Sequence, residues 1–493
     1  MFAAVSARRD HLHWLGYYGV DYHSHLATGY GGMATIGDEI ITRIHSLQNS
    51  QFKTEFAKDL HLFDGAGNFI IGTISNQAQP ISINPINRKL GIFVICINGF
   101  VNNAESLAVE LINSGDGFDY DEIDGQKIVN QAKLVGRLIS KKPNFIDGIN
   151  FAFEKVRGSV SILIMNSHGI YAARAKHGQT SLTIGRKEIN WVISSETNAF
   201  PNLSIEPVRM LKPGEIIMMH ETGFEVLQAG CSGSCQFCPF YWVYTGSPAS
   251  EYYNLSAESY RESMGELEVR KDFEAGFVPY AVSGVADSGT SYAHGYSNGS
   301  FDTGSPVRHI RPLIKYTPGW SRSYTPEKQI DRDRVALHKQ IPIRDIMQKF
   351  QNKDIVLTED SIVRGTQLMQ LLDRLNRIVR NTWSLAPANI HVRVGCPVLG
   401  WHCPYLGTTK SREEMASRKA IARLNSISVK SVTDDMLRPY LEYDSPLYRK
   451  LLELIAHDLG AASVMFPTLD EMIHITGLPR KDLCTYCWTG EGV

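Results

Sequence analysis

The stretch Val356-Leu357-Thr358-Glu359-Asp360-Ser361-Ile362-Val363-Arg364-Gly365-Thr366 decides how the second half of this chain folds. An apolar strand around Ile355–Leu357 ends at two adjacent acids, and a turn of small residues then opens the helix Thr366–Arg377. Free backbone N–H groups at a helix start, together with the helix dipole, favour a bound phosphate. The two carboxylates suit vicinal sugar hydroxyls or a hydrated Mg²⁺ ion. The loop therefore predicts a site for a ribose with a 5′-phosphate, unless the acids only cap the helix.

Similar strand–turn–helix units surround this loop. The apolar segment Tyr280–Val285 precedes the turn Asp287-Ser288-Gly289, and His391–Val394 precedes a turn with Pro and Gly. Strands that alternate with helices imply βαβ units and a parallel sheet. Between the first two units, Tyr316–Thr325 is rich in Pro, Gly, Ser and Arg and is expected to be a loop.

The first half of the chain is dominated by short strands. We expect strands at Phe69–Ile74, Gly91–Ile97, Val160–Met165, Tyr171–Ala173 and Trp191–Ile193. Two helices are expected among them, at Ala104–Ile112 and Gln126–Ile139. A Gly, Ser and Cys-rich piece at Gly230–Ser234 then marks a domain junction. This organisation predicts layered α and β structure in residues 1–230, followed by an α/β domain in residues 231–493.

The composition is that of an ordinary globular protein. The 493 residues are 43% hydrophobic, and their formal net charge is −1. That charge gives no general attraction to nucleic acid or to an anionic membrane, so neither is expected as a partner. No apolar run reaches the length of a membrane span, and the polar residues after Arg8 and Arg9 argue against a secretory signal. We therefore expect a cytoplasmic protein, and a homo-oligomer (a dimer or tetramer).

The eleven-residue loop closely resembles the phosphoribosylpyrophosphate (PRPP) signature of type I phosphoribosyltransferases. The turn at Asp287, Ser288 and Gly289 resembles the pyrophosphate-contacting turn of the same fold. The resemblance implies a PRPP site in which Mg²⁺ is held by Ser288, Glu359 and Asp360. Pyrophosphate would meet three cations on and beside the intervening loop. The residues assigned to PRPP are Asp287, Ser288, Gly289, Lys315, Arg322, Lys339, Glu359, Asp360, Ser361, Ile362, Val363, Arg364, Gly365 and Thr366.

The first half resembles an Ntn-type glutamine amidotransferase domain, which has αββα layers. The resemblance rests on Ala173–Leu182, Ser194-Ser195-Glu196 and Leu211–Ile216. Followed by a phosphoribosyltransferase domain, it is similar to the glutamine phosphoribosylpyrophosphate amidotransferase (amidophosphoribosyltransferase) family. That family implies release of ammonia from glutamine and its transfer to C1 of PRPP, with loss of pyrophosphate, in purine synthesis. Asn98-Gly99 resembles the family's oxyanion pair, although Asn-Gly is also a common turn.

Three parts of the glutaminase motif set are eroded. The family begins with a nucleophilic cysteine, and no Cys, Ser or Thr occurs in Met1–Val5. His23–Thr28 replaces the family's His-Arg-Gly-Gln-Glu-Ser, and Gly72–Asn76 lacks its carboxylate-binding arginine. A missing start of the sequence would explain only the first loss. We therefore expect an inactive glutaminase half and a second domain that uses free ammonia, or ammonia from a partner.

Eight cysteines need an explanation in a cytoplasmic protein. Two Cys-x-x-Cys pairs, Cys235/Cys238 and Cys484/Cys487, are compatible with a four-cysteine zinc site. The family resemblance instead implies a [4Fe–4S] cluster held by Cys238, Cys403, Cys484 and Cys487, with Cys238 at the start of an aromatic-rich strand. Two functions of other kinds also stay open. They are a non-catalytic PRPP or nucleotide sensor, and a transferase that joins PRPP to another acceptor such as a nucleobase.

Overall fold

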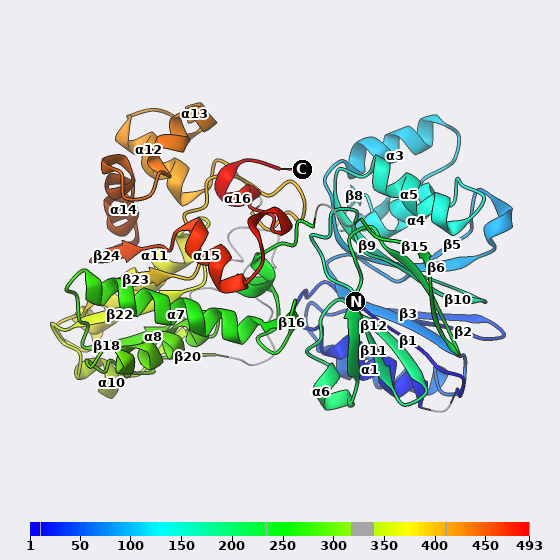
Figure 1. Ribbon diagram of the computed structural model, residues 1–493, viewed down its shortest axis with the longest axis horizontal. Helices are drawn as coiled ribbons and strands as arrows, with labels where there is room; N and C mark the ends of the chain where they lie inside the picture. Colours follow the sequence, from blue (N-terminus) through cyan, green and yellow to red (C-terminus); the bar gives the residue numbers. More distant parts are fainter. Residues whose placement is uncertain (10, 124, 232–234, 317–339, 410–411, 493) are drawn as a thin grey trace.

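The structure, a computed structural model, describes residues 1–9, 11–123, 125–231, 235–316, 340–409 and 412–492. It has two parts, one built on two antiparallel sheets and one on a parallel sheet (Figure 1). The C-terminus lies near the junction of these two parts (Figure 1).

Two antiparallel sheets form the first part. The seven-stranded sheet has the order β13 (Glu206–Met210), β11 (Thr183–Lys187), β12 (Asn190–Ser194), β1 (Phe2–Val5), β4 (Phe69–Ser75), β2 (Tyr30–Ile36) and β3 (Ile40–Ser46). The six-stranded sheet has the order β15 (Gly223–Gln228), β14 (Ile216–His220), β10 (Gly169–Ala173), β9 (Gly158–Asn166), β6 (Phe93–Val101) and β5 (Ile81–Ile83).

Alternation along β1 shows how the layers stack. Ala3 and Val5 face the second sheet, whereas Phe2 and Ala4 face helix α1 (Leu12–Asp21) on the outside. The outer face of the second sheet is covered by α3 (Ala104–Asn113), α4 (Gln131–Ile139) and α5 (Phe145–Lys155). The result is the expected αββα arrangement.

The second part is a five-stranded parallel sheet. Its order is β19 (Arg308–His309), β18 (Ala281–Gly284), β22 (Asp354–Glu359), β23 (Asn389–Val394) and β24 (Ser463–Met465). One face packs against α7 (Ala257–Glu274) and α8 (Thr290–Asp302). The other face packs against α11 (Thr366–Arg377), α12 (Ala416–Leu424) and α14 (Pro446–Leu459). The expected parallel α/β architecture is thereby confirmed.

Shorter elements complete the fold. They are α2 (Phe52–Phe56), β7 (Asp121–Ile123), β8 (Gln126–Ile128), α6 (Phe200–Leu203), β16 (Glu251–Tyr252), β17 (Leu255–Ser256), β20 (Leu313–Lys315), β21 (Gln340–Pro342), α10 (Arg344–Gln348), α13 (Asp434–Leu437), α15 (Leu469–Thr476) and α16 (Tyr486–Thr489). Short 3₁₀ or π turns lie at Leu60–Leu62, Arg88–Leu90, Tyr241–Thr245, Ile378–Thr382, Val429–Ser431, Arg438–Tyr440 and Arg480–Asp482.

The helix expected at Gln126–Ile139 is partly wrong. Gln126–Ile128 is strand β8, which pairs with β7 across a turn where Gly125 has a φ of 75°. Helix α4 begins only after Asn130, whose side chain accepts hydrogen bonds from the N–H groups of Ala132 and Lys133. Apolar residues recur at helical spacing through the hairpin and the cap as well, so the spacing alone predicted a helix that begins too early. The hairpin and the Asn130 cap set the true start of the helix.

The strand expected after Cys238 is also wrong. Tyr241–Thr245 forms a single π-helical turn, which Gly246 N–H closes by donating to the Tyr241 carbonyl at 3.0 Å. Its aromatic side chains are buried in one cluster. The segment therefore lacks the alternation of buried and exposed side chains that is typical of a strand with one face in solvent.

None of the described helices combines the length and apolar character that a membrane-spanning helix requires. The expected domain boundary near residue 230 stays a prediction.

Candidate active site

The carboxyl ends of β18 and β22 meet at the expected PRPP site. These strands pair in parallel with Gly284 opposite Thr358, so the turn after β18 lies beside the acids after β22. Ser288 Oγ donates to Glu359 Oε1 at 3.2 Å. The structure therefore brings together the two motifs that the sequence separates.

The two acids repel each other in a buried place. Burial, followed by the neighbouring Asp360 charge, raises the pKa of Glu359 well above its usual value. Burial also raises the pKa of Asp360, whose carboxylate accepts from Ser361 Oγ at 2.6 Å. Two buried oxygen ligands that resist ionisation suit a divalent cation, because its charge would offset their repulsion. The residues present therefore fit Mg²⁺.

The loop after the acids turns its side chains inward. Ile362 packs into the core between the sheet and α11, and Val363 packs into the aromatic cluster near the junction. Gly365 adopts a φ of 72° directly before α11, a conformation that favours glycine. The backbone N–H groups of Ile362, Val363 and Gly365 donate to no other described residue. Arg364 pairs with Glu414 at 2.6 Å. The loop thus offers backbone donors at a helix start, as a phosphate site requires.

Of the three predicted cations, the structure places Lys315 at this site. Its Nζ lies 2.6 Å from Asp287 Oδ2 in the turn after β18. Arg322 and Lys339 lie outside the described residues. Sequence reasoning missed Gln340, whose side-chain amide donates to the Ala286 carbonyl in the same turn. No motif marks this glutamine, since only the packing of β21 beside the turn reveals it.

Asn98 and Gly99 lie inside strand β6, opposite Ser161 and Val160 of β9. The alternative of an Asn-Gly turn is therefore wrong. A Cβ at Gly99 would come within 1.9 Å of the Ser159 carbonyl oxygen, so only glycine fits this close approach. Asn98 hydrogen-bonds the buried Tyr241, whose pKa is raised by burial and then by Cys238 and Glu196. The predicted oxyanion donor is thus engaged by a phenol of the junction.

A buried carboxylate, Glu196, joins the two parts of the molecule. His25 Nε2 lies 2.9 Å from Glu196 Oε2, and Ser250 Oγ donates to the same oxygen at 2.9 Å. The Ser247 N–H donates to it as well, at 3.2 Å. Burial alone would raise the pKa of Glu196, but the charge and hydrogen bond of His25 outweigh burial and lower it to about 2. Ser247 and Ser250 follow the junction in sequence, so the contact holds it against the first part.

We expect Glu196→Gln to lower the free energy of unfolding at neutral pH by about 3 kcal/mol, the value of the pKa shift. The folded pKa lies below the ordinary value of 4.5, so this stability is present above pH 4.5 and is lost as the pH falls toward 2. The difference between wild type and variant should therefore shrink across that range. Urea denaturation at neutral pH and at several acidic pH values measures it.

Glu251→Gln is the matched control because Glu251 is exposed on the adjoining strand β16. It should change the free energy of unfolding by less than about 0.5 kcal/mol. Equal stability of Glu196→Gln and wild type at neutral pH would contradict the role of this carboxylate.

Four of the eight cysteines converge from three segments. Cys484 N–H donates to the Phe237 carbonyl at 2.9 Å, which places the C-terminal segment beside Cys238. Trp401 N–H donates to the Cys487 carbonyl at 3.1 Å, which brings Cys403 to the same place. All four thiols are buried and none is in a disulfide. They are the four predicted by resemblance: Cys238, Cys403, Cys484 and Cys487.

Their chemistry fits a metal cluster. A hydrogen bond with Cys487 lowers the pKa of Cys403 to about 5, and Leu406 N–H donates to the Cys403 sulfur at 3.2 Å. The same bond, with burial, raises the pKa of Cys487 well above its usual value. A metal bound by both sulfurs would displace the proton of the hydrogen bond between them.

The geometry distinguishes the two candidate sets of cysteines. A tetrahedral zinc site with Zn–S bonds of about 2.3 Å places its sulfurs roughly 3.8 Å apart. Among the described residues, no three cysteine sulfurs lie within 4.8 Å of one another. Cys235 contacts Tyr253 Oη at 2.9 Å instead of joining the group. This arrangement favours the set with Cys403 over a zinc site made from two Cys-x-x-Cys pairs.

Comparison with known proteins agrees with this geometry, although no family model matches the chain. An amidophosphoribosyltransferase from Methanocaldococcus jannaschii is 28% identical over 501 aligned residues, which cover 96% of this chain and 93% of that protein. One from Bacillus subtilis is 24% identical, over 84% of this chain and 76% of that protein. Along most of its length the chain is similar to these amidophosphoribosyltransferases.

Solved structures related to this family share the fold. A glutamine PRPP amidotransferase from Bacillus subtilis, complexed with ADP and GMP, superposes with a TM-score of 0.77 at 21% sequence identity. The match covers 99% of this chain and 96% of that one. A structure described as the allosteric regulatory enzyme of purine biosynthesis gives a TM-score of 0.77 at 20% identity. The fold of these structures is therefore kept along nearly the whole chain.

Proposed function

We propose that this protein transfers ammonia to C1 of PRPP and releases pyrophosphate, giving phosphoribosylamine, the first step of purine synthesis. The ammonia lone pair forms the C1–N bond, and the C1–O bond to pyrophosphate breaks with inversion. The observation that carries the proposal is the contact between Ser288 and Glu359, which joins the two motif-bearing turns at one sheet edge.

The described residues support distinct tasks in this reaction. Glu359 and Asp360 would accept hydrogen bonds from the ribose hydroxyls, and the backbone from Ser361 to Thr366 would hold the 5′-phosphate. Asp287, Ser288 and Gly289 would contact the pyrophosphate, with Lys315 beside it. We assign Arg322 and Lys339 the same task by motif alone.

Two metal groups belong to the proposal. Ser288, Glu359 and Asp360 would hold Mg²⁺, which when bound neutralises negative charge on the pyrophosphate. Cys238, Cys403, Cys484 and Cys487 would hold a [4Fe–4S] cluster that ties the C-terminus to the junction. Zinc at the cysteines remains the alternative.

The first part is proposed to lack glutaminase activity. The sequence has no arginine in Gly72–Asn76, and Thr73 at this place is buried in strand β4. His23 does not supply the cation that would bind the carboxylate of glutamine. Its Nδ1 contacts the Gly19 carbonyl at 2.8 Å, and burial lowers its pKa well below the usual value. The engagement of Asn98 by Tyr241 supports the same conclusion. This proposal rests on these eroded motifs and not on where the sequence begins.

The test is pyrophosphate release from PRPP and Mg²⁺ with ammonium and, separately, with glutamine. We expect release with ammonium, and a rate with glutamine at least about 100-fold lower because glutamine cannot be held or hydrolysed. When a separate glutaminase is added to the assay with glutamine, it supplies ammonia, and the rate of pyrophosphate release should be restored.

Each other result favours a different function. Full activity with glutamine alone would contradict the inactive glutaminase. Binding of PRPP without pyrophosphate release in any assay would favour the sensor. Release only when a nucleobase is added would favour a transferase with another acceptor.

A further inference from the structure

Helices α7 and α8 approach so closely that their backbones touch. A Cβ at Gly295 would come within 1.9 Å of the Glu262 carbonyl oxygen, and one at Gly265 within 2.0 Å of the Tyr292 carbonyl oxygen. Both helices carry glycine where they meet, so the crossing is held by close packing on each side. Side chains that flank this crossing are therefore kept at short, fixed separations.

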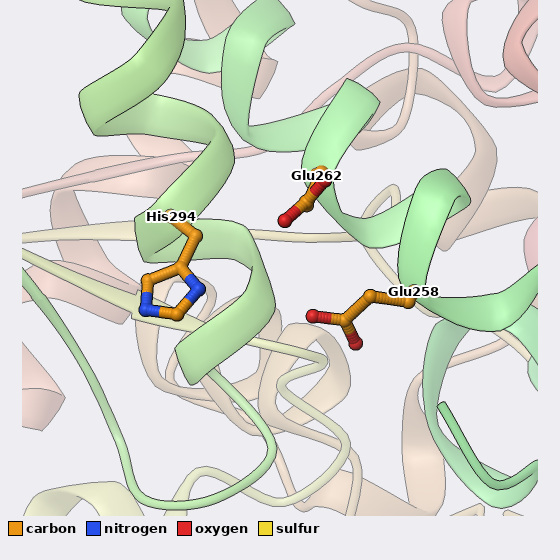
Figure 2. A group of neighbouring side chains, drawn as sticks. All are labelled: Glu258, Glu262 and His294. Carbon is orange, nitrogen blue, oxygen red and sulfur yellow. The ribbon is translucent and has the colours of Figure 1, made fainter. Parts of the chain in front are cut away.

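Three metal-ligating side chains flank the crossing. Glu258 and Glu262 lie one turn apart on α7, and His294 lies on α8 beside Gly295. Their nearest ligand atoms all lie within 4.8 Å of one another. Figure 2 shows the two carboxylates and the imidazole directed toward the space between the helices.

The carboxylates lack a balancing cation within the described parts of the chain. Within the described residues, the carboxylates of Glu258 and Glu262 lie near His294 and form no ion pair with a lysine or arginine, while like charges four residues apart on a helix repel. Ser291 Oγ donates to Glu258 Oε2 at 2.6 Å and so fixes one carboxylate. An arrangement that orients like charges toward one point without a counter-charge is suited to a bound cation.

A second imidazole indicates the kind of cation. His309 of β19 packs edge-on against His294, with ring centroids 4.6 Å apart. The group therefore combines carboxylates from one helix with a histidine from a second helix, and a second imidazole from a strand lies beside it. Imidazole nitrogen suits transition-metal ions, whereas Mg²⁺ prefers an all-oxygen set.

We propose that Glu258, Glu262 and His294 form a site for a first-row transition-metal dication such as Mn²⁺ or Zn²⁺, separate from the proposed Mg²⁺ site. His309 lies beside the site, in edge-on ring contact with His294. The metal would clamp the start of α8 to α7. The two sites are neighbours along the chain, because Ser288 contacts Glu359 and Ser291 contacts Glu258.

Mn²⁺ binding to the full-length protein, with its cysteine-held metal in place, tests this proposal. Free Mn²⁺ is measured by electron paramagnetic resonance in excess Mg²⁺, which occupies the all-oxygen site. We expect one tightly bound Mn²⁺ in wild type, and at least tenfold weaker binding in both Glu262→Gln and His294→Gln. Mn²⁺ should also raise the melting temperature of wild type but of neither variant.

Glu266→Gln is the matched control, because Glu266 lies one turn after Glu262 on the same face of α7 but packs against Gly299 of α8. It should bind Mn²⁺ as wild type does. His294 is exposed, so its variant tests the site without disturbing the core. The proposal is overturned if wild type binds no Mn²⁺ in excess Mg²⁺, or if either ligand variant binds it as tightly as wild type.

Discussion

Asp360→Asn is expected to reduce ammonia-dependent pyrophosphate release by about 10²–10³-fold while leaving the protein as stable or more stable. The amide cannot supply the negative charge that a metal and the ribose hydroxyls need. Burial raises the pKa of both acids, and the Asp360 charge raises that of Glu359 further, so the amide removes one buried carboxylate and its repulsion of Glu359. Activity and stability should therefore change in opposite directions. Pyrophosphate release and thermal denaturation of the same samples measure both.

Asp354→Asn provides the control for this substitution. Asp354 lies at the opposite end of β22, is exposed, and accepts from Asn389 Nδ2 at 3.2 Å. We expect it to leave pyrophosphate release within about twofold of wild type. Unchanged activity in Asp360→Asn would show that the PRPP site has been placed wrongly.

Cys403→Ser is expected to abolish the visible absorbance of the iron–sulfur cluster and to lower the free energy of unfolding by more than about 2 kcal/mol. Cys403 is the thiol whose pKa is lowered to about 5, and it comes from a segment distant in sequence from the other three ligands. Its loss would free the C-terminal segment from the turn at Trp401. Absorbance spectra, iron content and urea denaturation measure the outcome.

Cys235→Ser is the informative control. Cys235 lies three residues before Cys238, but its thiol contacts Tyr253 Oη. The substitution should leave the colour and the iron content unchanged. If Cys235→Ser loses bound metal and Cys403→Ser keeps it, the metal is held by the two Cys-x-x-Cys pairs, as in the zinc alternative.

Local patterns predicted the second part of the fold well. Strand β22, its two acids, the turn and helix α11 are contiguous, and the expected helix Thr366–Arg377 is the observed one. Each step depends on a property of neighbouring residues: apolar side chains, a left-handed glycine and a helix start. The failures have local reasons too, since helical spacing around residues 126–139 runs through the β7–β8 hairpin and past the Asn130 cap.

Residues joined only by packing were harder to predict. His25 and Glu196 both lie in quoted motifs, yet no spacing rule indicates that their side chains meet or that Ser250 contacts the same carboxylate. The contact of Tyr241 with Asn98 likewise depends on how the π-helical turn meets the first part.

The sequence by itself determined the order of the two folds, the PRPP-type loop and the erosion of the glutaminase motifs, because each is written in a continuous segment. Only the tertiary structure decided between the two cysteine sets that the sequence left open and placed Asn98-Gly99 inside a strand. It alone brought Glu258 and Glu262 to His294. These groupings depend on strand register and on the closeness of two helix backbones, which arise when distant segments pack together.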